Sequence, residues 1–196
     1  MKYLKLFEEY DIELIPHLKE RGIDPDKTKV LIDEESGNSY FFLYNLSGQI
    51  IGYQKYNPNL QKKSNPTDPK MAKYFTWVSD EGLGKYLAAW GLESVDFIKD
   101  KYLFITEGIF DAARIQEAGY PAISVLGNDP SKDLLNWLFT LSQKRIVIYD
   151  NDKAGRKLKK AGDFSFCVPS GKDANDLTPE EAKVFLNKCL VKCGLS

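Results

Sequence analysis

Residues 102–111 have the sequence YLFITEGIFD, in which an apolar run at residues 102–106 is followed directly by Glu107 and Gly108. An uninterrupted apolar run of this length predicts a strand that is buried on both faces of a sheet. Three more such runs occur, at residues 122–126, 145–149 and 164–168. Helical patterns follow the four runs, at residues 110–118, 132–141, 153–160 and 179–193. This alternation predicts a parallel sheet with helices on both faces.

Acidic residues follow three of the expected strands at the point where each strand ends. They are Glu107 and Asp111 after the first strand, Asp150 and Asp152 after the third, and Asp173 after the fourth. Because the carboxyl ends of parallel strands meet at one edge of a sheet, we expect these side chains to share one rim. One carboxylate can cap a helix, but the second carboxylate of an Asp-x-Asp exceeds what a cap needs. An extended Asp-x-Asp points both carboxylates the same way, so the set predicts a site for magnesium or manganese.

The composition excludes several other classes of protein. Apolar residues make up 43% and charged residues 28% of the chain, as in ordinary globular domains. No apolar run approaches the ~20 residues that cross a bilayer, and the acidic start predicts no signal peptide. The single histidine, His17, for which we expect a surface or helix-cap position, and three cysteines without C-x-x-C spacing predict neither a zinc site nor a disulfide framework. Free cysteines indicate a reducing compartment such as the cytoplasm.

The N-terminal half has a different pattern. Residues 3–22 are amphipathic with a helical period, and Gly22 marks the end of that pattern. Short strand patterns follow, at residues 30–32, 40–44 and 50–54. They predict a small antiparallel meander, followed by a polar, proline-punctuated loop at residues 57–72.

Basic residues are concentrated locally rather than over the whole chain. The net charge is -1, with 27 basic and 28 acidic residues, which excludes a protein that coats nucleic acid by bulk charge. Residues 55–85 hold six lysines against Asp68, Asp80 and Glu81. This local excess is compatible with a nucleic-acid groove and equally with a solvated loop.

Several of these motifs together resemble one family. Within residues 105–156, the runs ITEGIFD, VLG and IYDNDKAGR are similar to a Toprim domain, the fold shared by bacterial-type DNA primases, topoisomerases and certain nucleases. Further runs are similar to primases, including the primase part of phage primase-helicases: LSGQIIGYQ at residues 46–54, KYFT at 73–76, LGKYL at 83–87 and KDAND at 172–176.

This resemblance implies a fold and a division of the chain. We expect an α/β protein in which residues 99–180 form the Toprim domain, with a Rossmann-like, mostly parallel sheet. A small α+β, strand-rich subdomain at residues 1–98 precedes it, and residues 181–196 form a C-terminal helix and tail.

The resemblance also implies an activity, that of a DNA primase, which synthesises short RNA primers from NTPs on single-stranded DNA by nucleotidyl transfer. Glu107 is then the general base or proton-positioning group for the 3′-hydroxyl. Divalent Mg²⁺ or Mn²⁺, with no zinc, is held by carboxylates, which are Asp111, Asp150, Asp152 and Asp173. Contacts to the template and the nucleotide are expected from basic residues, which are Lys55, Lys73, Lys85, Lys153, Arg156 and Lys172. For Lys153 and Arg156, a solvated helix face is an equal alternative.

The implied partners are the single-stranded DNA template and NTPs. No G-x-x-x-x-G-K-[S/T] run indicates an attached helicase, and three scattered cysteines cannot form the zinc-binding template-recognition module of such primases. Three interpretations stay open: a stand-alone catalytic core, a core that relies on a zinc-binding module and a replicative helicase as separate partners, or a domain excised from a longer protein. In each case we expect the cytoplasm of a bacterial or phage-infected cell, with no membrane association.

Two alternatives stay open. A Toprim nuclease would use the same carboxylates to activate water, and a degenerate Toprim protein would only bind nucleic acid or partners. The strand-rich N-terminal half favours the primase over a small nuclease, which does not need it. The complete acidic set argues against degeneration, and the length of 196 residues argues against a topoisomerase gate.

Overall fold

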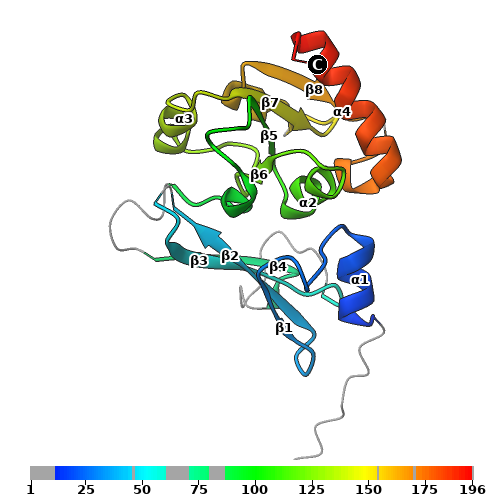
Figure 1. The fold of residues 1–196 in the computed structure, drawn as a ribbon. Helices are drawn as coiled ribbons and strands as arrows, with labels where there is room; N and C mark the ends of the chain where they lie inside the picture. The colour runs from blue at the N-terminus through cyan, green and yellow to red at the C-terminus, as the bar shows by residue number, and fades with distance from the viewer. Residues whose placement is uncertain are drawn as a thin grey trace, which may run out of the picture.

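The computed structural model describes residues 12–45, 47–60, 71–79, 87–153, 155–169 and 171–195. The chain forms two four-stranded sheets, one above the other in Figure 1. The sheet of the N-terminal half is antiparallel, and that of the C-terminal half is parallel. The predicted α/β fold, with a strand-rich part ahead of a parallel sheet, is therefore confirmed.

The antiparallel sheet has the strand order β1-β2-β3-β4, as a meander does. Its strands are β1 (Val30–Asp33), β2 (Asn38–Tyr44), β3 (Ile50–Tyr56) and β4 (Tyr74–Val78). The prediction found the first three and missed β4, although its sequence YFTWV consists of residues with high strand propensity. The polar loop predicted before it lies partly outside the described residues, at 61–70.

Within the described residues, helix α1 (Leu14–Glu20) accompanies this sheet. It is shorter than the predicted helix at residues 3–22, of which residues 1–11 lie outside the described part of the chain. Pro16 occupies the first turn, where its missing N–H costs no helical hydrogen bond. Gly22 follows with a positive φ of 80°, which explains why the helix ends there.

The parallel sheet has the order β6-β5-β7-β8. Its strands are β5 (Tyr102–Thr106), β6 (Ala122–Ser124), β7 (Lys144–Tyr149) and β8 (Phe164–Cys167). The helices are α2 (Ile109–Glu117), α3 (Lys132–Leu138) and α4 (Pro179–Cys193), with 3-10 turns η3 (Leu92–Ser94), η4 (Gly155–Ala161) and η5 (Ala174–Asp176). The predicted helix at residues 153–160 is thus a 3-10 helix.

Alternate residues of the central strands enter two hydrophobic clusters, one on each face of the parallel sheet. Phe104 and Ile146 pack with residues of α2 and α4, whereas Leu103 and Val147 pack with residues of α3 and η4. The first cluster also contains Phe41 and other residues of the antiparallel sheet and α1, so the two halves share one core. Within the described residues, no helix is long and apolar enough to cross a membrane.

Candidate active site

A cavity of about 300 Å³ lies where the two halves of the chain meet. The parallel-sheet half lines it with residues that follow strand ends, which are Glu107, Gly108, Ile109, Phe110, Asp111, Leu126, Gly127, Asp150 and Asp173. The N-terminal half contributes three residues, Arg21, Gln54 and Tyr74. Four of the five predicted carboxylates therefore line one cavity, as the topology of parallel strands requires.

The turn after β5 is fixed by hydrogen bonds from its neighbours. The Thr106 hydroxyl donates to the Gly108 carbonyl at 3.0 Å, and the Ser124 hydroxyl donates to the Glu107 carbonyl at 2.9 Å. A Cβ at Gly108 would lie 2.8 Å from Oδ2 of Asp111. The glycine after the glutamate therefore leaves room for the Asp111 carboxylate beside the turn.

Asp111 lies in the first turn of α2, and its carboxyl has a strongly raised pKa. Burial, together with the nearby charges of Asp173 and Asp150, raises the pKa of its carboxyl to about 7. The Asn175 N–H donates to Asp111 Oδ1 at 3.1 Å, and this bond and the Arg21 charge oppose the rise in pKa. A cation in the cavity would therefore stabilise the ionised form of the Asp111 carboxyl.

Asp173 has a structural role in addition to its place in the cavity. Its side chain caps η5 by accepting a hydrogen bond from the Asp176 N–H at 2.9 Å, and Asp176 caps in return. Helix capping, the alternative explanation for a single acidic residue, therefore applies to Asp173.

Asp152 differs from what the sequence predicts. The Asp150–Asp152 segment is not extended, because the Asp152 N–H donates to the Asp150 carbonyl at 2.7 Å. The Asp152 carboxylate accepts a hydrogen bond from the Gly155 N–H at 2.5 Å at the start of η4, and Asp152 is exposed and does not line the cavity. The expectation that an extended Asp-x-Asp points both carboxylates the same way is wrong, because one of them caps the following turn.

The acidic rim suits a hard divalent cation by its chemistry. All four lining carboxylates offer oxygen ligands, and the pKa of Asp111 is raised first by burial and then by the charges of Asp173 and Asp150. Within the described residues, no three His, Cys, Asp or Glu side chains are grouped closely enough to hold one ion. Magnesium in nucleotide-processing sites is held by one or two carboxylates together with water and substrate phosphates, so pairs of carboxylates fit it.

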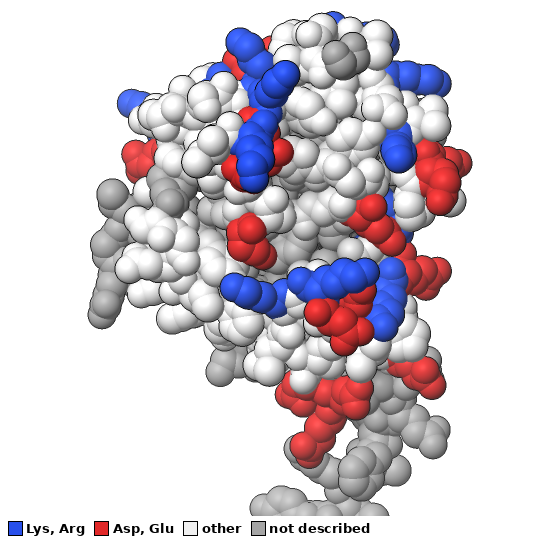
Figure 2. All heavy atoms as spheres, viewed as in Figure 1, with Lys and Arg blue, Asp and Glu red and all other residues white. Residues whose placement is uncertain are grey.

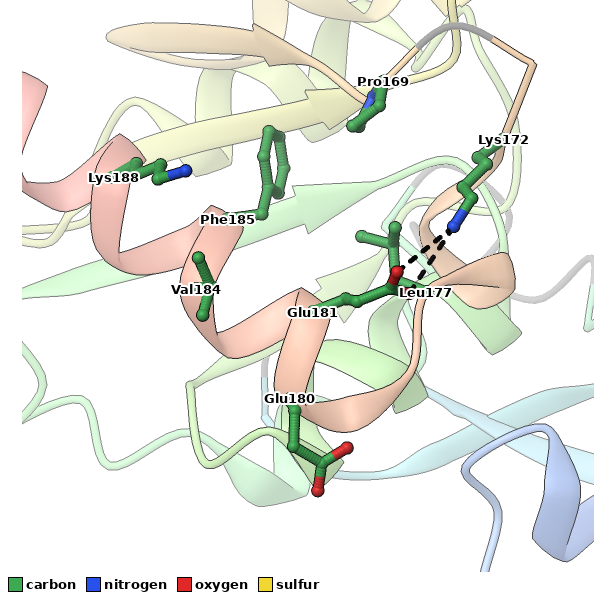
Figure 3. Close-up of a pocket in the computed structure, with 8 residues that line it drawn as sticks. All are labelled: Pro169, Lys172, Leu177, Glu180, Glu181, Val184, Phe185 and Lys188. Atoms are coloured by element: carbon green, nitrogen blue, oxygen red, sulfur yellow. Dashed lines mark hydrogen bonds and ion pairs between the residues drawn. The ribbon is translucent and has the colours of Figure 1, made fainter.

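Those of the predicted basic residues that the structure describes do not line this cavity. Lys55 is buried in β3, Lys73 Nζ lies 5.7 Å from the centre of the Tyr56 ring, and Lys153 and Arg156 are exposed near η4. Lys172 lies beside a different cavity, of about 520 Å³, where its amine is 3.4 Å from a Glu181 carboxylate oxygen of α4 (Figure 3). Lys85 lies outside the described residues.

The cation that does line the cavity is Arg21, which the sequence analysis missed. Its guanidinium lies 3.6 Å from the centre of the Phe110 ring and donates to Asn175 Oδ1 at 2.8 Å and to the Tyr56 hydroxyl at 3.1 Å. The one sequence signal for Arg21 is its place directly before Gly22, which ends the helix. The residues that contact Arg21 are distant in sequence, so this signal does not show its role.

His17 belongs to the same group of side chains and is not a simple surface residue. Its ring is stacked on that of Tyr56, with Nε2 2.8 Å from the Tyr56 hydroxyl. Partial burial lowers the pKa of His17, and the neighbouring Arg21 lowers it further.

Charged side chains of both signs are interspersed on one face of the molecule (Figure 2). On the face drawn in Figure 2, basic groups lie in small clusters with acidic groups among them. This distribution agrees with the near-zero net charge and leaves recognition of an anionic ligand to local features.

The parallel-sheet half also matches a known family. The family model described as Toprim-like matches residues 104–178. Residues 104–178 form a Toprim-like domain. The Toprim domain contains every carboxylate of the cavity, from Glu107 to Asp173.

The chain is also homologous to a DNA primase of Thermotoga maritima, with 36% identity over 100 residues, or 45% of this chain and 18% of the relative. It resembles a DNA primase domain from Pseudomonas aeruginosa (TM-score 0.62, 17% identity, 90% of this chain and 58% of that chain). It also resembles the primase fragment of the bacteriophage T7 primase-helicase (TM-score 0.54, 19% identity, 77% and 62%). These structures share the fold of both halves. The chain spans about a fifth of the curated relative it matches.

Proposed function

We propose that this chain is the catalytic core of a primase-type RNA polymerase, which makes short RNA primers on single-stranded DNA. The observation that carries the proposal is the composition of the cavity. Carboxylates of the Toprim domain form one wall, and Arg21, Gln54 and Tyr74 of the N-terminal half form the other. A polymerase must hold a template and a nucleotide against its acidic groups, and a second wall provides the surface for that.

Each group in the cavity has a proposed role. Glu107 accepts or positions the proton of the attacking 3′-hydroxyl. Asp111 with Asp150 or Asp173 would hold a divalent ion, Mg²⁺ or Mn²⁺, which neutralises charge on the attacking and leaving oxygens. Asp152 is a further proposed ligand, reached if its carboxylate leaves the η4 turn.

Arg21 is the proposed contact to phosphate. The hydrogen bonds of its guanidinium described above go to neutral oxygens of Asn175 and Tyr56. A third, of 3.5 Å, goes to the Tyr74 hydroxyl, so the charge is not cancelled by a bonded carboxylate among the described residues. Lys73, whose Nζ lies 5.7 Å from the centre of the Tyr56 ring, adds a second positive charge in the neighbourhood of Arg21. Such a pair favours an anionic strand or triphosphate.

The proposed setting follows from this activity. The template and NTPs are the substrates, a replicative helicase and a zinc-binding template-recognition module are partners, and the cytoplasm of a bacterial or phage-infected cell is the location. The phage T7 relative is by its name a primase-helicase, which supports the helicase among these partners.

A primer-synthesis assay tests the proposal. Labelled NTPs, single-stranded DNA and Mg²⁺ or Mn²⁺ are incubated with the wild type, Asp150→Asn and a matched control, Asp133→Asn, whose carboxylate is exposed on α3. We expect short RNA products from the wild type and the control and none from Asp150→Asn. Metal-dependent loss of the DNA or of added RNA, without synthesis, would instead indicate the nuclease.

A further inference from the structure

Two nitrogens of the Arg21 guanidinium are held by neutral oxygens. Nε donates to Asn175 Oδ1 at 2.8 Å, and Nη1 donates to the Tyr56 hydroxyl at 3.1 Å and to the Tyr74 hydroxyl at 3.5 Å. Among the hydrogen bonds of the described residues, none of those made by this guanidinium uses Nη2, so this nitrogen is left for an anionic ligand. The orientation of Arg21 beside the cavity therefore depends on what holds Asn175 and Tyr56.

The Tyr56 hydroxyl has a hydrogen of its own, which needs an acceptor. Tyr56 is 1% exposed, so this hydrogen cannot go to bulk water. Arg21 cannot accept it, because a guanidinium only donates, and it occupies one lone pair of the hydroxyl oxygen. Among the described residues, the other partner of that oxygen is His17, whose Nε2 is 2.8 Å away. The Tyr56 hydroxyl therefore donates to Nε2 of His17.

This direction of donation fixes the state of the His17 ring. An Nε2 that accepts carries no hydrogen, so the ring is neutral and its hydrogen is on Nδ1. A protonated ring would donate from both nitrogens and would leave the Tyr56 hydrogen without an acceptor. Burial and the charges of Arg21 and Lys73 lower the pKa of His17, whereas Glu20 opposes the shift. The charges around the ring therefore favour the neutral form that the hydrogen bonds require.

We infer that His17 is a positioning residue, which holds Arg21 in place beside the cavity through the Tyr56 hydroxyl. This inference rests on the proposed function, in which Arg21 contacts the phosphate of a nucleotide or of a strand. Neither Tyr56 nor His17 lines the cavity, so both act from behind Arg21. Their rings are stacked at an interplanar angle of 13°, with centres 5.9 Å apart, and this contact fixes the imidazole. A guanidinium held in advance loses less freedom when an anion binds.

Three variants separate this role from simple packing. Tyr56→Phe removes the hydroxyl and keeps the ring, whose centre lies 4.8 Å from that of Phe110. His17→Gln keeps an acceptor near the position of Nε2 and cannot be protonated, whereas His17→Leu has no acceptor. The matched control is Tyr120→Phe, which removes a hydroxyl that donates to Asn187 Oδ1 at 2.8 Å, away from the residues that line the cavity.

The state of the imidazole can be measured directly, because His17 is the single histidine of the chain. In protein with ¹⁵N-labelled histidine, NMR of the wild type at neutral pH should show the neutral tautomer with its hydrogen on Nδ1. Tyr56→Phe should raise the pKa of His17, because it removes a hydrogen bond that favours the neutral ring. Tyr120→Phe should leave the tautomer and the pKa unchanged. A wild type with the hydrogen on Nε2 would overturn the inference.

Primer synthesis and the binding of labelled oligo-dT measure the effect on Arg21. We expect Tyr56→Phe and His17→Leu to raise the KM for NTPs or the Kd for oligo-dT by about 3- to 10-fold, with little change in kcat. A rise in KM indicates that Arg21 contacts the triphosphate, and a rise in Kd indicates the strand. His17→Gln should restore most of the loss. In an Arg21→Ala background, Tyr56→Phe should have no further effect.

Two further results would contradict the positioning role. If Tyr56→Phe and His17→Leu have the KM and Kd of the wild type while all three make primers, His17 does not position Arg21 and the proposed function stands. If Tyr56→Phe weakens binding equally in the presence and absence of Arg21, the two residues do not act through Arg21. A wild type that makes no primers would refute the proposed function, and the NMR measurement would still test the hydrogen bonds, since it does not depend on activity.

Discussion

Asp111 is the residue whose chemistry depends most on what enters the cavity. A carboxyl with a pKa of about 7 in the folded protein and about 4 in the unfolded chain binds its proton more tightly when folded. The stability that this group contributes is fully present below pH 4 and is lost as the pH rises through 7. The metal-free protein therefore carries a penalty at neutral and basic pH.

Asp111→Asn should remove that penalty. The amide oxygen can still accept the hydrogen bond from the Asn175 N–H. We expect the variant to be more stable than the wild type by about 1–3 kcal/mol at pH 8 in EDTA, with the gain vanishing near pH 4. Urea unfolding at both pH values measures it. If the wild type and Asp111→Asn are equally stable at pH 8, the carboxyl is ionised there without a cost in stability. Added Mg²⁺ should increase the stability of the wild type and leave that of Asp111→Asn unchanged.

Arg21 connects the N-terminal helix to the Toprim domain through Asn175 and the Phe110 ring. Arg21→Lys keeps the charge but loses the planar donors and the stacking. We expect Arg21→Ala to lower the free energy of unfolding by about 1–3 kcal/mol and to reduce the salt slope of DNA binding by about 1. Arg21→Lys should keep the slope and lose the stability. If Arg21→Ala has the same salt slope of DNA binding as the wild type, Arg21 does not contact phosphate.

Asp152 accepts a hydrogen bond from the Gly155 N–H at the start of η4, and it either only caps this helix or also holds an ion. Asn caps a helical turn about as well as Asp, and Ala does not cap. If Asp152 only caps η4, the variant Asp152→Ala loses about 1 kcal/mol of stability, and Asp152→Ala and Asp152→Asn both keep primer synthesis. If it also holds an ion, as we propose, Asp152→Asn keeps the stability of the wild type and loses primer synthesis. Thermal unfolding and the synthesis assay, run on both variants, separate the two roles.

Most elements could be predicted from local sequence signals. The apolar run at Tyr102–Thr106 gave β5 to the residue, and α4 begins and ends as expected because Thr178 caps it and Gly194 follows it. Arg21 could not be found this way, because its partner Asn175 is 154 positions away. Tyr74 lines the cavity and its neighbour Phe75 does not, because successive residues of a strand lie on opposite faces.

One of the two hydrophobic clusters joins the two halves of the chain. Phe41 of the antiparallel sheet, Leu18 of α1 and Ile115 of α2 belong to the same hydrophobic cluster. Separating the halves would expose apolar surface on each of them. The predicted boundary near residue 98 therefore does not by itself mark a point at which the halves fold independently.

We expect the full chain to unfold in a single transition that fluorescence and circular dichroism report alike. A fragment of residues 99–196 should bind a hydrophobic dye and lack a cooperative transition, because α2 loses its cover from Phe41 and Leu18. Two resolved transitions of the full chain, or a fragment that unfolds cooperatively, would contradict the shared core.

The segment that enters the parallel-sheet half is itself hydrogen-bonded into both sheets. Ala89 exchanges hydrogen bonds with Tyr44 of β2, and the next residue, Trp90, exchanges them with Ser124 of β6. A segment that is hydrogen-bonded to both sheets holds the two halves at a fixed distance and does not serve as a hinge between them. We therefore expect the opening between the halves to keep a constant width, so that in the proposed polymerase a growing strand would slide through it without a movement of the two halves.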